Sequence, residues 1–264
     1  MRQAETPLVS VITVVFNGAD HLEEAIEAVA AQTYANLEHI VIDGGSTDGT
    51  VDIIRRHESS IEKWISEPDR GLYDAMNKGL SLVTDPGAYV LFANADDSLY
   101  SADAIEMMVS SSEGEDLLYG KMIFTDGDVS GMLGRKVDFD DLAHETLCHP
   151  ATLVRRRLFD TVGTFDTTFR IAADYDHIVR CFAAGATTRF VDVIVSKMRM
   201  GGLSDDRFLL SCRERKKVIR RHFPLVPRLL GVWQVNLYDI PRNAARRFLA
   251  RAGLLGHWRA LKGS

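Results

Sequence analysis

Hydrophobic residues in the first hundred positions alternate between short, mostly apolar runs and runs in which they recur every three or four residues. The mostly apolar run Leu8–Phe16 is typical of a strand that is buried on both faces of a sheet. In the next segment, Asp20–Gln32, the residues Leu22, Ile26 and Val29 recur at helical spacing. The same two patterns then predict a strand at Leu37–Ile42, a helix at Thr50–Ser59, a strand at Lys63–Ser66, a helix at Tyr73–Val83 and a strand at Ala88–Ala93. This alternation predicts an α/β fold with a largely parallel sheet.

Polar and glycine-rich loops follow the ends of four predicted strands. They are Asn17-Gly18, Asp43–Thr50, Glu67–Gly71 and Asn94–Asp97. Because ligands of parallel α/β sheets bind beyond the carboxyl ends of the strands, we expect these loops to converge on one cleft. The glycine-rich loop Asp43–Thr50 is suited to phosphate binding at a helix N-terminus, although an ordinary turn explains it equally well. Neither GxGxxG nor GxxxxGK[ST] occurs, so the usual dinucleotide and mononucleotide phosphate loops are excluded.

Two adjacent carboxylates follow the last of these strands, in the sequence Asn94-Ala95-Asp96-Asp97. Paired carboxylates repel each other unless a cation offsets their charge. Mg²⁺ and Mn²⁺ are usually held by one or two carboxylates together with phosphate oxygens of a substrate. The tetrapeptide therefore predicts a divalent cation site for a diphosphate. The alternative is a solvated acidic turn before a helix that starts near Ser101.

The composition is that of a globular enzyme, with 46% hydrophobic and 26% charged residues among 264. The three cysteines, Cys148, Cys181 and Cys212, lack CxxC spacing and are odd in number, which argues against a disulfide framework and a zinc cluster. We therefore expect a reducing, cytoplasmic compartment. Charged and polar residues interrupt the most apolar segment, Leu225–Ile240, so no membrane-spanning helix is expected.

Charge divides the chain into two parts. Residues 207–264 contain 14 Lys/Arg and two acidic residues, a net charge of +12, which leaves 17 basic and 35 acidic residues, a net charge of −18, in the first 206. We therefore predict a catalytic domain at residues 1–204 and a basic helical extension at residues 205–264. Within this extension, Ile240–Leu255 places apolar residues on one helical face and arginines on the other. Such a helix either lies on an anionic membrane surface or packs on the acidic domain. No nucleic acid partner is expected, because the −18 domain would repel a polyanion.

The order of these motifs resembles the family 2 glycosyltransferases of the GT-A fold. The residues that carry the resemblance are the strand before Asn17-Gly18, then Val41–Thr50, Asn94–Asp97 and Ala173–Asp176. Two further segments, Glu67–Gly79 and His149–Thr152, are similar to the bacterial O-antigen, capsule and exopolysaccharide subgroup. The resemblance covers about residues 7–204. It implies a Rossmann-like, mostly parallel nucleotide-binding sheet with flanking helices, followed here by the basic helical tail.

The resemblance also implies which residues bind the donor and the cation. Asn17 and Asp43 are expected on the nucleotide, with Asp43 at the nucleobase or ribose, and Asp69-Arg70 are expected to close the nucleoside pocket. The metal motif of the family is usually Asp-x-Asp. Here Asn94 occupies its first position and Asp96 its second, so Asp96, helped by Asp97, is the expected ligand of Mg²⁺ or Mn²⁺. Asn94 lacks charge and is expected to bond ribose or a metal-bound water.

The second family signature is Glu-Asp, whose aspartate is the general base; here it reads Ala173-Asp174. Asp174 is therefore the expected base, in the first turn of a helix that starts near Ala173. Without the resemblance, an ordinary acidic residue favoured by the helix dipole is the better explanation of Asp174. His149 is open to three interpretations: a structural residue, an acceptor contact or a phosphate contact.

We therefore expect a metal-dependent, inverting glycosyltransferase. It would move a sugar from a nucleoside diphosphate sugar, with UDP as the default, to a hydroxyl of a glycan or lipid-linked glycan in surface polysaccharide synthesis. A peripheral position on the cytoplasmic face of the membrane is expected through the C-terminal helices. Two alternatives are a nucleotidyltransferase that acts on a sugar phosphate and a catalytically silent module that binds nucleotide or carbohydrate.

Overall fold

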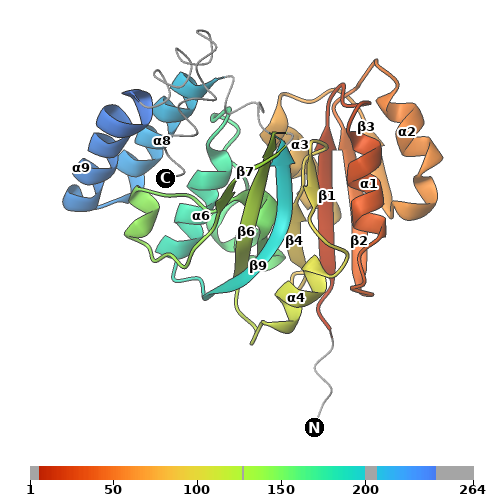
Figure 1. Ribbon diagram of the computed structural model, residues 1–264, viewed down its shortest axis with the longest axis horizontal. Helices are drawn as coiled ribbons and strands as arrows, with labels where there is room; N and C mark the ends of the chain where they lie inside the picture. Colours follow the sequence, from red (N-terminus) through yellow and green to blue (C-terminus); the bar gives the residue numbers. More distant parts are fainter. Residues whose placement is uncertain (1–5, 127, 200–206, 242–264) are drawn as a thin grey trace.

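The computed structural model describes residues 6–126, 128–199 and 207–241 of the chain. It shows a mixed α/β fold in which helices flank a central sheet (Figure 1). Nine strands of the described residues form this sheet, in the order β3-β2-β1-β4-β8-β6-β9-β5, with β7 paired to β6. The mostly parallel first half and the mixed second half confirm the predicted fold class.

The first half of the sheet consists of parallel strands. These are β1 (Val9–Val15), β2 (Leu37–Asp43), β3 (Lys63–Ser66) and β4 (Tyr89–Phe92). All seven residues of β1 are buried, because both faces of this central strand are covered. The register pairs Val15 with Asp43 and Asp43 with Ser66. The loops after these strands therefore leave the same edge of the sheet, as predicted from the sequence.

The second half of the sheet is mixed. Its strands are β5 (Asp97–Leu99), β6 (Leu117–Asp126), β7 (Asp128–Leu133), β8 (Thr152–Arg155) and β9 (Thr188–Arg199). β8 runs antiparallel to β4 and β6, whereas β6 and β9 are parallel. β5 pairs antiparallel with β9 directly after the Asn94–Asp97 loop. This pairing fixes the C-terminal end of that loop to β9.

Helices cover both faces of the sheet. They are α1 (Leu22–Ala30), α2 (Thr50–Arg56), α3 (Leu72–Leu82), α4 (Ala104–Ser110), α5 (Arg156–Val162), α6 (Ala173–Ala183), α8 (Phe208–His222) and α9 (Leu225–Gln234). Short 3-10 turns lie at Glu58–Ser60, Asp141–Ala143 and His149–Ala151, and a π-turn, η4, lies at Val235–Asp239. The predicted helix Thr50–Ser59 is thus divided into α2 and a 3-10 turn. No described helix is long and apolar enough to cross a membrane.

The two faces of the sheet have separate hydrophobic cores. α3, α5, α6 and α8 cover one face, where they pack against Ile12 and Val90. α1 and α4 cover the other face, where Val29 and Met108 join Val11. α3 packs so closely on the sheet that a Cβ at Gly79 would lie only 2.5 Å from Cγ2 of Ile12.

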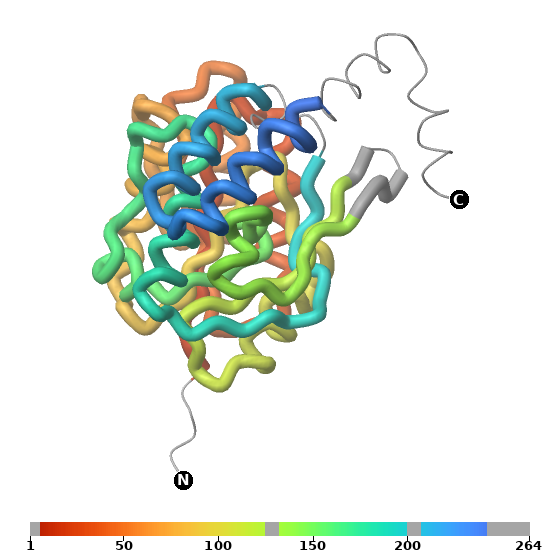
Figure 2. The backbone as a smooth tube through the Cα atoms, turned by 90° about the vertical axis from the view of Figure 1, so that its left-hand side faces the viewer, coloured from red at the N-terminus to blue at the C-terminus, as the bar shows by residue number. Residues whose placement is uncertain are grey.

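The described part of the predicted C-terminal extension joins the first of these cores. Cys212, Val218 and Phe223 of this segment are buried in the same cluster as Ile12. α8 and α9 lie side by side, at the opposite end of the molecule from α1 and α2 (Figures 1 and 2). The predicted domain boundary at residues 204/205 lies outside the described residues. So does the predicted basic helix Ile240–Leu255, apart from its first two residues.

Candidate active site

A cavity of about 570 Å³ opens beyond the carboxyl ends of β1 and β4. Its walls come from the β1 and β4 loops, the start of α3, the start of α6, the β6–β7 pair and α8. The lining includes Phe16, Asn17, Tyr73, Asn94, Asp96, Asp97, Leu133, Thr146, Leu147, His149, Ile171, Asp174, Tyr175, Ser211 and Arg215. The cavity therefore brings together five of the residues predicted for donor, metal and base, together with His149. Asp43, Asp69 and Arg70 do not line it.

Asp43, at the end of β2, holds the glycine-rich loop together. Its carboxylate accepts hydrogen bonds from Ser66 Oγ at 2.6 Å, from Ser46 Oγ at 2.5 Å and from the backbone N–H of Gly45. The side chain is fully buried. Its two oxygens therefore serve the folding of the loop, and a direct contact with the nucleotide stays a prediction.

Asn17 joins the β1 loop to the same glycine-rich loop. It has φ of 49°, a left-handed conformation that asparagine tolerates better than most residues. Its Oδ1 accepts the N–H of Thr47 at 2.9 Å, and its own N–H donates to Ser46 Oγ at 2.7 Å. Asn17 thus fixes the relative position of two loops at the edge of the cavity.

Phe16, predicted from the sequence to be the last residue of a strand, lies beside these loops. Phe16 is 65% exposed, although it follows the buried strand β1. A Cβ at Gly44 would touch both the Asp69 carboxylate and the Phe16 ring, so these three residues meet at one corner of the cleft. The Arg70 side chain is 83% exposed and pairs with Asp74 at 2.7 Å.

Asp97 is buried at the floor of the cavity, and Asp96 is partly exposed within it. Oδ2 of Asp97 accepts the N–H of Asn94 at 3.2 Å, whereas its Oδ1 has no hydrogen-bond partner among the described residues. Burial raises the pKa of Asp97 to about 7, and the neighbouring Asp96 carboxylate adds to this effect, while His149 opposes it. A buried carboxylate oxygen without a partner is costly, so this position is suited to a cation.

The described side chains do not complete a metal site by themselves. They contain no group of three or more His, Cys, Asp or Glu residues that could hold a metal ion. Asp96 and the free oxygen of Asp97 nevertheless fit the hard-oxygen ligands of Mg²⁺ or Mn²⁺, which commonly take their remaining ligands from phosphate and water. The donor set therefore fits a cation that is bound together with a diphosphate.

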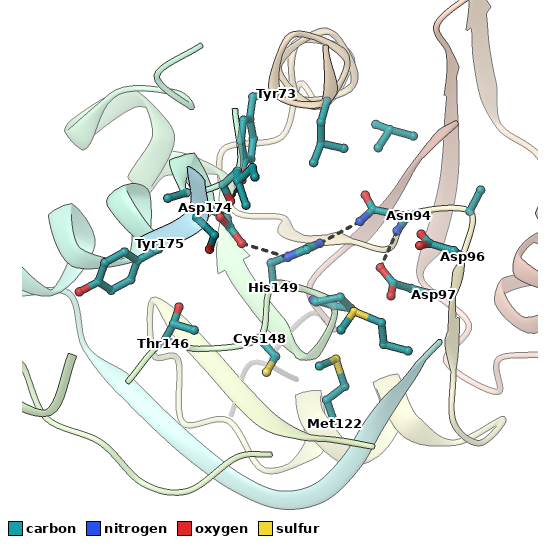
Figure 3. A pocket seen from close by; sticks show the side chains of 18 of the residues that line it. Tyr73, Asn94, Asp96, Asp97, Met122, Thr146, Cys148, His149, Asp174 and Tyr175 are labelled. Atoms are coloured by element: carbon teal, nitrogen blue, oxygen red, sulfur yellow. Dashed lines mark hydrogen bonds and ion pairs between the residues drawn. The ribbon is translucent and has the colours of Figure 1, made fainter. Parts of the chain in front are cut away.

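A hydrogen-bonded chain crosses the cavity from Asn94 to Asp174 (Figure 3). Asn94 Nδ2 lies 3.1 Å from His149 Nε2, and His149 Nδ1 lies 3.1 Å from Asp174 Oδ2. The other carboxylate oxygen, Oδ1, accepts the hydroxyl of Tyr73 at 2.8 Å. Both ring nitrogens of His149 are thus engaged within the protein, which favours its structural interpretation.

Electrostatics keep Asp174 ionised. Burial raises the pKa of Asp174, but the hydrogen bond and charge of His149 and the hydroxyl of Tyr73 outweigh burial and lower it. Burial likewise lowers the pKa of His149, but Asp174, Asp97 and Asp96 outweigh it and raise it. Asp174 also lies in the first turn of α6, where the helix dipole favours negative charge. Asp174 is therefore held in its ionised form.

Glu214 of α8 holds the loop that leads into α6. It is 8% exposed, and its carboxylate accepts the backbone N–H groups of Arg170, Ile171 and Ala172 at distances of 2.9 to 3.1 Å. The carbonyl of Ile171 in turn lies 2.6 Å from the Tyr73 hydroxyl, which shares its single hydrogen between this carbonyl and Asp174 Oδ1. Glu214 was not among the residues predicted from the sequence. One signal was present, because it is one of only two acidic residues in the basic segment 207–264.

α8 also places Arg215 at the cavity. Its guanidinium donates to the backbone carbonyl of His144, lies 3.3 Å from Asp239 Oδ2 and sits 6.0 Å from the Tyr175 ring centre. Two residues of the predicted extension, Ser211 and Arg215, therefore line the same cavity as Asp174.

Comparison with known proteins identifies the family. A family model described as Glycosyl transferase family 2 matches residues 10–163. A PGL/p-HBAD biosynthesis glycosyltransferase from Mycobacterium bovis is 37% identical over 208 residues, which span 75% of this chain and 80% of that protein. An uncharacterized glycosyltransferase from Mycobacterium tuberculosis is 33% identical over 192 residues, or 66% of this chain and 68% of that protein.

Solved structures share the fold at lower identity. The mannosyltransferase PcManGT from Pyrobaculum calidifontis, in complex with GDP-Man and Mn²⁺, superposes with a TM-score of 0.67 at 19% identity and covers 99% of this chain and 82% of its own. TarS residues 1–349 from S. aureus, in complex with UDP, superposes with a TM-score of 0.65 at 17% identity over 86% of this chain and 70% of its own. Together with the family match and the identity to the mycobacterial proteins, this shows that the chain belongs to the family 2 glycosyltransferases and has the GT-A fold.

Proposed function

We propose that this glycosyltransferase moves a sugar from a nucleoside diphosphate sugar to an acceptor hydroxyl with inversion, and that Asp174 is its general base. The observation that carries the proposal is the hydrogen-bonded chain Asn94, His149, Asp174 across one cavity. It connects the loop of Asp96, which is suited to a metal-bound diphosphate, to a carboxylate held in its ionised form. A donor and an acceptor bound on the two sides of this chain would place the reacting atoms between them.

The nucleoside of the donor is expected at the corner formed by Phe16, Gly44 and Asp69. An exposed aromatic ring offers a flat surface on which a nucleobase stacks. The Asp69 carboxylate is suited to accept hydrogen bonds from ribose or base, and Asn17 and Asp43 hold the loops around them. One solved relative was in complex with UDP and another with GDP-Man. These complexes support a nucleoside diphosphate sugar as the donor class, with a UDP sugar as the default.

Asp96 and Asp97 would hold Mg²⁺ or Mn²⁺ against the diphosphate of the donor. When bound, the cation supplies charge neutralisation for the departing diphosphate. The unpartnered Oδ1 of Asp97 and the Mn²⁺ in the complex of the solved mannosyltransferase support this assignment. The side chain of Asn94, which replaces the usual first aspartate, lies 3.1 Å from His149 Nε2 and so links the cation loop to the base.

Asp174 accepts the proton of the acceptor hydroxyl as that oxygen forms its bond to the anomeric carbon. The bond from the anomeric carbon to the diphosphate oxygen breaks, and its electron pair leaves with the diphosphate. His149 and Tyr73 each occupy one lone pair on a different oxygen of the carboxylate. Each oxygen has two lone pairs, so both retain one for the acceptor hydroxyl.

The acceptor side of the cavity supports an acceptor with an apolar part. Next to Asp174, the walls carry Leu147, Ile171 and Tyr175, with Ser211 and Arg215 as polar groups. A hydroxyl of a lipid-linked glycan, as used in surface polysaccharide synthesis, fits such a mixed wall. A peripheral position of the enzyme on the cytoplasmic membrane face, with residues 205–264 as its attachment, would bring it to such acceptors.

The direct test is Asp174→Asn, assayed by release of nucleoside diphosphate from a panel of nucleotide sugars with alkyl glycosides as acceptors. We expect transfer to fall by several orders of magnitude, because the amide keeps the shape but accepts no proton, while nucleotide binding stays intact. Asp52→Asn, on the exposed face of α2, is the matched control and should transfer normally. Unchanged transfer by Asp174→Asn would remove this residue from the role of base.

A further inference from the structure

One face of α9 and η4 exposes large apolar side chains to solvent. Six of these side chains are between 51% and 66% exposed: Leu225, Val226, Leu229, Leu230, Trp233 and Leu237. Their spacing of one, three or four residues places them on a single helical face. We call this set the α9 apolar face. Contiguous exposed apolar surface of this kind on a folded protein marks an interaction site.

The opposite side of α9 is fixed to the domain, so the orientation of the apolar face is set by packing. Gly231 lies against the backbone carbonyl of Ala143, where a Cβ would not fit. Val235 is fully buried. The Gln234 side chain bonds His144 twice, to its ring nitrogen at 2.9 Å and to its carbonyl at 3.1 Å. The helix therefore presents its apolar residues outward while its small and polar residues face the protein.

The segment that carries this face is strongly basic. Of the eight basic residues within 207–241, Arg215 lines the cavity and pairs with Asp239, whereas five are exposed: Arg207, Arg213, Lys217, Arg220 and Arg221. The two acidic residues of the same segment are unavailable to a partner, since Glu214 is buried and Asp239 pairs with Arg215. The sequence adds six Lys/Arg and no acidic residue between Arg242 and Ser264. A second copy of this cationic surface would be repelled, whereas an anionic lipid surface is attracted.

We propose that the α9 apolar face inserts into the interfacial region of an anionic bilayer, with the basic residues of α8 and α9 against the lipid headgroups. Trp233 is suited to this position, because its amphipathic ring favours the membrane–water interface. α8 packs on α9 (Figure 2) and supplies Ser211 and Arg215 to the cavity. Docking on α9 would thus bring the acceptor side of the cavity near the membrane. The role of docking in reaching the acceptor rests on the proposed lipid-linked acceptor, whereas the docking itself does not.

The test is flotation of the full-length protein with vesicles of phosphatidylcholine, alone or mixed with phosphatidylglycerol. We expect the wild type to float with the anionic vesicles, and less at high salt. The double variant Leu229→Ser/Trp233→Ser should lose about tenfold or more in partition coefficient, because two inserted apolar side chains are removed. The matched control Tyr100→Ser/Met132→Ser removes two similarly exposed apolar side chains elsewhere and should float like the wild type.

Three results would overturn the proposal. One is undiminished flotation of Leu229→Ser/Trp233→Ser. Another is loss of flotation in Arg246→Gln/Arg247→Gln alone, which would assign attachment to the residues after α9. A third is a stable dimer in lipid-free sedimentation that the serine variant dissociates, which would make the face a contact between copies. Brominated lipid offers a check that needs no change in α9: in a Trp64→Phe/Trp258→Phe background it should quench Trp233 fluorescence, and an absence of quenching would contradict insertion.

The same preparations also separate this inference from the proposed function. Turnover of nucleotide sugar with a water-soluble alkyl glycoside is measured without vesicles for the wild type and the serine variant. Equal turnover with reduced flotation supports docking through α9. Flotation without any turnover would leave docking supported while contradicting the proposed chemistry.

Discussion

Glu214→Gln tests whether α8 positions the base from 40 residues away. The wild-type carboxylate accepts three consecutive backbone N–H groups just before α6, with four contacts of 2.9 to 3.1 Å. One oxygen, Oε2, accepts all three N–H groups, so glutamine can keep these bonds, but it loses the negative charge and turns an NH₂ group toward the Arg170 N–H. Because a hydrogen bond to a charged acceptor contributes about 1.5–3 kcal/mol and a neutral one about 0.5–1.5 kcal/mol, the free energy of unfolding should fall by roughly 1–3 kcal/mol.

The same change should reach catalysis through Ile171. This residue donates its N–H to Glu214, and its carbonyl accepts the Tyr73 hydroxyl that also bonds Asp174. A displacement of this loop by a fraction of an ångström therefore moves the base. We expect kcat to fall by about tenfold to a hundredfold while the KM for the nucleotide sugar changes little.

The assay combines denaturant unfolding with steady-state transfer, and Glu115→Gln is the matched control. Glu115 is also a largely buried carboxylate that accepts a backbone N–H, from Glu113, and an ion pair from Arg189, but it does not line the cavity. Its variant should lose stability and keep kcat. If Glu214→Gln loses stability to the same extent and keeps kcat as well, then Glu214 stabilises the fold without positioning Asp174.

Three further predictions address the cation, the donor and the buried His177. Asp96→Ala should weaken metal-dependent nucleotide binding in calorimetry, because the exposed carboxylate of the cation pair is lost, and undiminished metal dependence would discredit Asp96 as ligand. Phe16→Ala should weaken binding of the nucleoside diphosphate by about 1–3 kcal/mol if the base stacks on the ring, whereas equal affinity would place the base elsewhere. Burial lowers the pKa of His177 to about 3, so the folded protein keeps this ring neutral, whereas the unfolded chain protonates it below about pH 6.5. The contribution of the neutral ring to the free energy of unfolding is therefore fully present above about pH 6.5. It falls by up to roughly 1.4 kcal/mol per pH unit as the pH drops toward 3. His177→Phe, which keeps the stack on Phe159, should flatten this acid limb in unfolding experiments, and an unchanged slope would contradict a neutral buried His177.

Local patterns were sufficient to predict the first half of the fold. The central strands β1 and β4 are mostly apolar because both of their faces are covered, and the ends of the parallel strands carry the polar loops that predicted the cleft. The family motifs added Asp174, which lies across the cavity from Asp96. The family and the fold are confirmed by the comparisons, whereas the roles of the individual site residues stay predictions.

Contacts between distant segments could not be predicted in the same way. β6 pairs with β9 across about seventy residues, and no periodicity in either strand specifies that partner. The same holds for Glu214, whose partners are backbone N–H groups that carry no sequence signature. His149 was open to three interpretations because the partners of its ring nitrogens, Asn94 and Asp174, lie 55 and 25 residues away in the sequence. Phe16 looked like the end of a buried strand because its exposure depends on the loop that follows it.

The measurement that tests the central claim most directly is a thermal-shift panel of UDP, GDP and dTDP, each with Mn²⁺, Mg²⁺ or EDTA, on the wild type and on Asp96→Ala. Ligand at about 100 times its dissociation constant stabilises a protein by roughly 2.7 kcal/mol, which is a shift of several degrees for a chain of this size. We predict a metal-dependent shift for one nucleotide that Asp96→Ala loses. A folded wild type that shows no shift with any nucleotide and either metal would contradict a cavity built for a metal-bound nucleoside diphosphate.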